Sequence, residues 1–109
     1  MSGFSVRMID ASALKEWVAQ DRVHIIDVRE PDEYAAVHIP GARLVPLSAF
    51  DPTRIPTDPD RPVVLHCHTG ARCGVAAHLL ERAGYALPVH RLSGGLVAWA
   101  HAGGALSGR

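Results

Sequence analysis

Residues 67–72 combine a possible nucleophile with groups that bind anions. Cys67 follows an apolar run of strand length, and the residues after Arg72 have the apolar spacing of a helix. A cysteine is nucleophilic as its thiolate, and a helix N-terminus lowers the pKa of a nearby thiol. A short loop of small residues can turn its backbone N–H groups toward an anion, with Gly70 supplying the conformational freedom. Arg72 adds a permanent charge that can hold an oxyanion, so the segment favours a reactive thiol over an inert buried cysteine.

The stretches around this loop alternate between strand-like and helical patterns. Helical patterns begin after Ser12 as an N-cap and at Pro31, and two more cover residues 73–83 and 96–101. The connection over residues 50–62 is polar and rich in proline, with one helical turn expected after Ser48. Apolar runs typical of strands cover residues 4–9, 23–28, 43–46, 63–67 and 89–92.

This alternation predicts an α/β fold with a central, mostly parallel sheet of about five strands flanked by helices on both faces. In such sheets, ligands bind beyond the carboxyl ends of the strands. Residues 27–29, 67–72 and 93–95 all lie at predicted strand ends. We therefore expect these three segments to share one site, and we expect Trp99 to lie in the core.

The composition and charge of the sequence favour some classes of protein over others. The 109 residues are 48% hydrophobic and 20% charged, and they predict one domain over residues 1–109. Eleven basic residues balance eleven acidic ones, so the charge pattern does not favour binding to nucleic acid or a membrane surface. The N-terminal residues lack a signal-peptide pattern, and two cysteines are too few for a secreted disulfide scaffold. A cytoplasmic location is the expectation.

Four segments together resemble the rhodanese-like domain family. Residues 67–72 resemble its active-site loop, which has the pattern Cys-x-x-Gly-x-Arg. The other matches are Asp27-Val28-Arg29-Glu30 followed by Glu33-Tyr34, the turn His38-Ile39-Pro40-Gly41-Ala42, and Leu92-Ser93-Gly94-Gly95 followed by Trp99. The chain departs from the family at two positions: Val37 stands where glycine is frequent, and Cys73 stands where a small hydroxyl residue or alanine is usual.

The resemblance implies a sulfurtransferase of the thiosulfate-using type, with no cofactor and no metal. Cys67 would take the outer sulfur of a donor such as thiosulfate and pass it to cyanide, a thiol or a partner protein. Asp27, Arg29 and Glu33, with Gly94 and Gly95, are expected to support the loop, although Arg29 and Glu33 are spaced to pair with each other. Arg72 would steer the anionic donor. The N–H groups around the terminal sulfur would belong to His68, Thr69, Gly70, Ala71, Arg72 and Cys73.

A phosphatase or arsenate reductase is one alternative, because His66-Cys67 followed by an arginine resembles the His-Cys-x5-Arg signature of cysteine phosphatases. Here only four residues separate Cys67 from Arg72. A phosphate with three equatorial oxygens needs a larger cradle, whereas this loop is sized for a single sulfur. No aspartate general acid is obvious near the loop, and sulfur chemistry is therefore favoured.

Further alternatives involve the neighbouring histidines and the second cysteine. His66, Cys67, His68 and Cys73 include metal-binding types, but neighbours in a strand point to opposite faces, and no metal site is expected. A disulfide with oxidised Cys67 would make Cys73 a resolving thiol, while a simple replacement for serine is the plainer interpretation. A non-enzymatic or relay-type module for sulfur delivery or redox sensing through this pair is the alternative to an enzyme.

Overall fold

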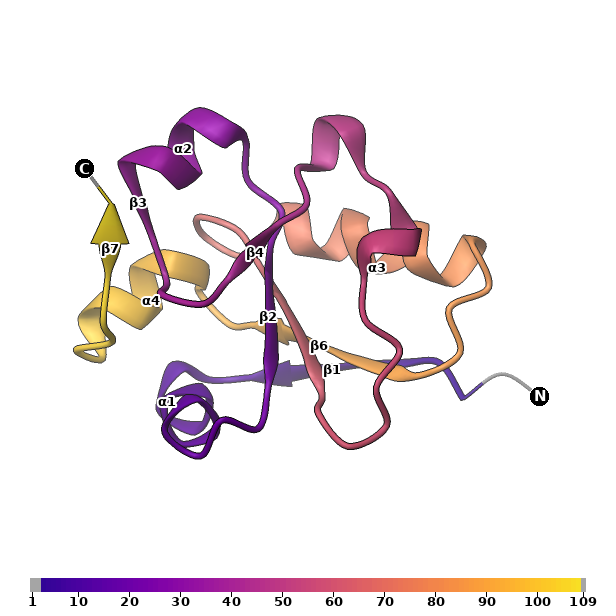
Figure 1. Ribbon diagram of the computed structural model, residues 1–109, viewed down its shortest axis with the longest axis horizontal. Coiled ribbons are helices and arrows are strands. Elements are labelled where there is room, and N and C mark those ends of the chain that lie inside the picture. Colours follow the sequence, from indigo (N-terminus) through magenta and orange to yellow (C-terminus); the bar gives the residue numbers. More distant parts are fainter. Residues whose placement is uncertain (1–2, 109) are drawn as a thin grey trace.

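The computed structural model describes residues 3–108, and Figure 1 shows helices packed around a twisted sheet. In chain order the elements are β1 (Ser5–Ile9), α1 (Ala11–Ala19), β2 (His24–Asp27), α2 (Pro31–Ala36), β3 (Val37–His38), β4 (Arg43–Leu44), two 3₁₀ turns (Leu47–Ala49 and Pro52–Arg54), β5 (Val63–His66), α3 (Arg72–Arg82), β6 (Pro88–Leu92), α4 (Gly95–His101) and β7 (Ser107–Gly108).

The main sheet has the strand order β1-β6-β5-β2-β4, and every neighbouring pair is parallel. Strand β5 therefore lies in the middle, between β6 and β2. Because parallel strands end at the same edge, the residues that follow β2, β5 and β6 meet there. The α/β fold predicted from the sequence, with its five-stranded parallel sheet, is confirmed.

Alternate residues of the central strands enter two different cores. Ile26 and Leu65 pack on one face with residues of α3, whereas Ile25 and Val64 pack on the other face with residues of α1 and α4. Figure 1 shows α3 on the opposite side of the sheet from α1 and α4. Burial on both faces explains why β5 begins with three consecutive apolar residues, and the strand has no exposed edge or face.

Local signals set the helix boundaries, with one correction to the sequence-based expectation. Asp10, not Ser12, is the N-cap of α1, and its carboxylate accepts a hydrogen bond from the N–H of Ala13 at 2.8 Å. An aspartate satisfies the free N–H groups of a first turn as well as a serine does, and β1 ends just before it. Helix α2 opens at Pro31 as expected, with a capping box between Glu30 and Glu33.

Two other differences concern short segments. The connection after β4 contains two helical turns instead of one, and it is anchored by the buried Ile55. Strand β7 was not anticipated; it pairs antiparallel with β3, which ends at His38, the first residue of the predicted turn over residues 38–42. Isolated bridges of two residues carry no periodicity that a sequence pattern can reveal.

Within the described residues, no helix is long and apolar enough to cross a membrane. The same part of the chain contains no group of three or more His, Cys, Asp or Glu side chains arranged to hold a metal ion.

Candidate active site

Cys67 is the first residue after the central strand and is almost fully enclosed, with 1% of its surface exposed. Its Sγ accepts a hydrogen bond from the N–H of Gly70 at 3.0 Å. A hydrogen bond from the Cys73 thiol, together with loop N–H groups, lowers the pKa of Cys67 to about 4 despite its burial. The side chain is therefore a thiolate at neutral pH, which is the nucleophilic form.

The start of α4 orients the first peptide groups of the loop. The N–H groups of Leu96 and Val97 donate to the carbonyls of Cys67 and His68, at 2.9 and 3.2 Å. The C=O and N–H of one peptide group point in opposite directions. Because these two carbonyls are held against α4, the N–H groups of His68 and Thr69 point away from that helix. The N–H that contacts the Cys67 sulfur is that of Gly70, further along the loop.

Gly95 makes this close approach possible. A Cβ at this position would lie 2.6 Å from the Cys67 carbonyl oxygen and 2.5 Å from that of His68, and its backbone φ is +58°. Gly94 has a φ of +74°, and its added Cβ would collide with Ala98. Residues 67–68 and 94–95 therefore meet, and residues 27–29 lie beside them, since the N–H of Val28 donates to the carbonyl of His66 at 3.0 Å.

The loop residues differ in how far they reach the surface. His68, Thr69 and Ala71 are exposed, Gly70 and Arg72 are half-buried, and Cys73 is buried. Gly70 bends the loop with a φ of +112°.

Arg72 is held by Glu33 of α2. Its two terminal nitrogens donate to the two carboxylate oxygens at 2.7 and 2.9 Å. This forked pair, followed by the N–H of Glu30, lowers the pKa of Glu33 to about 2. Glu33 does not pair with Arg29, although the two are suitably spaced: its carboxylate turns toward the loop over residues 67–72, because α2 lies over the carboxyl end of the sheet.

Arg29 instead pairs with Asp27 below the loop. The exposed fractions of the two residues are 2% and 0%, and four hydrogen bonds of 2.7 to 3.1 Å join them. The Arg29 guanidinium also donates to the carbonyl of Val37 at 2.7 Å, tying the end of β2 to β3. Burial lowers the pKa of the adjacent His66, so that imidazole is neutral at physiological pH.

Arg91 of β6 is a site residue that the sequence interpretation missed. Its guanidinium donates to the Gly70 carbonyl at 2.8 Å, and its Nε lies 3.4 Å from the Cys73 sulfur. It fits because position 74 is glycine: an added Cβ there would lie 2.9 Å from the guanidinium. The only signal in the sequence was its place in the strand before Ser93-Gly94-Gly95.

Comparison with known proteins identifies the family. The model of the rhodanese-like domain matches residues 10–102. The chain belongs to the rhodanese-like domain family. Its likeness to solved structures includes the crystal structure of a thiosulfate sulfurtransferase from Pseudomonas aeruginosa, with a TM-score of 0.79 and 27% identity, over 94% of this chain and 20% of that one. The family resemblance of the sequence is thereby confirmed.

Relatives of this rhodanese-like chain include proteins named for sulfur transfer. A sulfurtransferase of Allochromatium vinosum is 38% identical over 100 residues, covering 90% of this chain and 92% of that protein. The probable adenylyltransferase/sulfurtransferase MoeZ of Mycobacterium tuberculosis is 41% identical over 92 residues, covering 80% of this chain and 23% of MoeZ. The chain also spans 52% of an uncharacterized Synechocystis protein, so several relatives are much longer than the part it matches.

The lowered pKa of Cys67 predicts unusual alkylation behaviour. Iodoacetamide reacts with thiolates, so the rate should rise through about pH 4 and stay level at higher pH, whereas a thiol of ordinary pKa 9.0 would still gain reactivity above pH 8. Mass spectrometry would measure the rate of alkylation. The Cys67→Ser protein, which keeps the buried Cys73, should react slowly at every pH, and a rate that rises between pH 8 and 10 in the native protein would contradict the thiolate.

The contact between Gly95 and the loop predicts a difference between two glycine substitutions. Gly84 has a φ of +85° with nothing within 4 Å of an added Cβ, so Gly84→Ala should cost about 1 kcal/mol of the free energy of unfolding from backbone strain alone. Gly95→Ala adds a collision with two carbonyls and should cost about 3 kcal/mol or more. Urea unfolding, followed by tryptophan fluorescence, measures both. Equal losses would show that the loop does not depend on this approach.

Proposed function

We propose that this protein is a sulfurtransferase that carries a sulfane sulfur as a persulfide on Cys67, taken from a donor such as thiosulfate and given to cyanide or a thiol. The observation that carries the proposal is the enclosed Cys67 thiolate in a short loop whose N–H groups face it. Membership of the rhodanese-like family and relatives named as sulfurtransferases support it.

The first half of the reaction forms the persulfide. The Cys67 thiolate attacks the outer sulfur of thiosulfate, the bond between the two thiosulfate sulfurs breaks, and sulfite leaves with its electron pair. The new terminal sulfur then carries the negative charge, and the loop N–H groups from His68 to Cys73 stabilise it. In the second half, an acceptor attacks that terminal sulfur and Cys67 leaves as the thiolate.

The enclosure of Cys67 limits which donors fit. Only a narrow group can reach a sulfur with 1% residue exposure, and the terminal sulfur of thiosulfate is such a group. Fixed N–H groups, which cannot be screened or titrated, stabilise the charge on the thiolate. Arg72 stands at the rim with its charge partly neutralised by Glu33, so we assign it a role in attracting and orienting the donor.

Sulfur uptake is the direct test. Reduced protein incubated with thiosulfate should gain one sulfur atom on Cys67, measured by intact mass and peptide mapping, and cyanide should remove it as thiocyanate. The Cys67→Ser protein should gain no sulfur, because it has no reactive thiolate at this position.

Two outcomes would change the assignment. Absence of sulfur uptake from thiosulfate and from polysulfide would overturn the proposed function. A stable persulfide that neither cyanide nor a small thiol removes would favour the relay alternative, in which the acceptor is the surface of a partner protein.

The pair formed by Arg72 and Glu33 predicts opposite effects of two substitutions on donor use. Arg72→Ala removes a positive charge and should raise the KM for thiosulfate about fivefold. Glu33→Gln removes the neutralising carboxylate, keeps the acceptor for the N–H of Glu30, and should lower that KM by a similar factor. Steady-state kinetics at low salt measures both. Identical KM values in all three proteins would exclude Arg72 from donor binding.

A further inference from the structure

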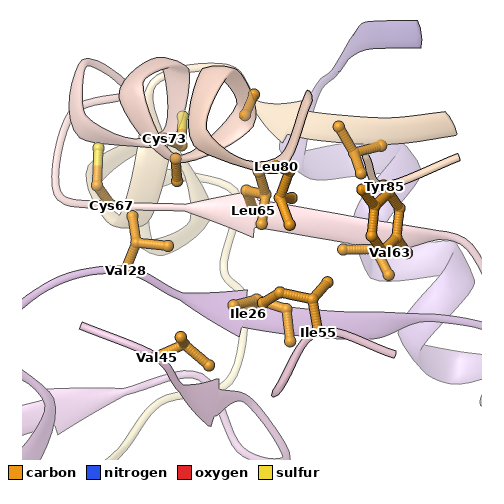
Figure 2. Packing of buried hydrophobic residues seen from close by; sticks show 13 residues of the cluster. Ile26, Val28, Val45, Ile55, Val63, Leu65, Cys67, Cys73, Leu80 and Tyr85 are labelled. Atoms are coloured by element: carbon orange, nitrogen blue, oxygen red, sulfur yellow. The ribbon is translucent and has the colours of Figure 1, made fainter. Parts of the chain in front are cut away.

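Cys73 is a second thiol beside the catalytic one, and the reaction described above does not consume it. It lies in the first turn of α3 with 0% of its surface exposed, and its sulfur is 3.0 Å from the carbonyl oxygen of Gly70. The N–H of the same glycine contacts the Cys67 sulfur, also at 3.0 Å. Figure 2 shows both cysteines at the same end of the buried cluster.

Arg91 places a positive charge next to this second thiol. Its Nε is 3.4 Å from the Cys73 sulfur, and no carboxylate in residues 3–108 forms an ion pair with it. A cation at this distance stabilises negative charge as it develops on sulfur. Arg72, by contrast, is engaged by Glu33, so Arg91 is the arginine available to the interior of the loop.

The charge on Cys67 keeps Cys73 inactive in the resting protein. The neighbouring thiolate and burial both raise the pKa of Cys73, while Arg91 lowers it. Formation of the persulfide moves the negative charge to the terminal sulfur and leaves the inner sulfur of Cys67 neutral and electrophilic. The repulsion that suppresses Cys73 then weakens, whereas the contact with Arg91 remains.

We propose that Cys73 resolves the Cys67 persulfide, releasing the sulfur as hydrosulfide and leaving a disulfide between Cys67 and Cys73. This inference rests on the proposed function, because it needs the persulfide. It names the immediate acceptor as the protein's own second thiol, and it makes the external reductant a dithiol that reopens the disulfide.

The step balances without an external oxidant. The Cys73 sulfur attacks the Cys67 Sγ, and the bond from that Sγ to the terminal sulfur breaks. The terminal sulfur leaves with the electron pair and takes the proton of Cys73, forming HS⁻. The sulfane sulfur is thereby reduced by two electrons, which come from the two cysteines as they are oxidised to the disulfide. Charge is conserved, because one anion enters the step as the persulfide and one leaves as HS⁻.

The test follows the fate of the sulfur in the absence of oxygen. Reduced native protein, Cys73→Ser, Cys73→Ala and Arg91→Met are each loaded with thiosulfate, desalted and sampled over time. Intact mass under non-reducing conditions and a hydrosulfide assay give the readouts. Two replacements at position 73 guard against a folding defect in either one, and circular dichroism confirms that each protein is folded.

The native protein should gain a sulfur and then convert to a species lacking two hydrogens, with an equal amount of hydrosulfide released. Both Cys73 variants should keep the added sulfur and release none. Arg91→Met should slow the conversion about tenfold, equivalent to one pKa unit of the attacking thiol.

A persulfide that persists in the native protein, added sulfur that maps to Cys73, or hydrosulfide release by the Cys73 variants at the native rate would each overturn the inference. A persistent persulfide on Cys67, or hydrosulfide release by the Cys73 variants, leaves the proposed function intact, because Cys67 has still taken up sulfur. Added sulfur on Cys73 would also contradict the proposed persulfide on Cys67. Failure of every protein to take up sulfur would overturn both.

Discussion

The site depends on one constraint, the capture of two loop carbonyls by the N-terminus of α4. With the carbonyls of Cys67 and His68 bound by Leu96 and Val97, the N–H groups of the same two peptide units, those of His68 and Thr69, must point away from α4. The start of the loop is therefore positioned by backbone geometry that the fold imposes, and Gly95 is the residue that allows the two segments to touch. The position of the loop over residues 67–72 thus follows from how α4 packs beside the sheet.

The charged side chains near the Cys67 sulfur differ in how far they are exposed to solvent. The pair of Arg72 and Glu33 covers the rim, where solvent and salt weaken it. Arg91 lies under the loop, beside Cys73. The thiolate itself is stabilised by hydrogen-bond donors at fixed positions, so its ionisation should depend little on ionic strength, whereas attraction of an anionic donor should depend on it strongly.

The sequence predicted those features that local pattern determines. The alternation of apolar runs and helical spacing was sufficient for the sheet, and residues 67–72 form their loop within one short segment. The contact of Glu33 with Arg72 was not anticipated and Arg91 was missed, because these contacts join residues 39 and 21 positions apart. Such contacts depend on strand order, which places β6 beside β5, and a single sequence does not state that order.

The buried pair of Asp27 and Arg29 limits how this sequence can evolve. Loss of either residue alone leaves an unpaired charge in the interior and lowers the free energy of unfolding by about 3–5 kcal/mol. Replacement of both residues by apolar ones can leave that free energy nearly unchanged. A lineage that explores new residues at one position must therefore change the other almost simultaneously, or acquire a stabilising change first. The two residues are thus inherited together, because a single substitution at either position gives a poorly folded protein.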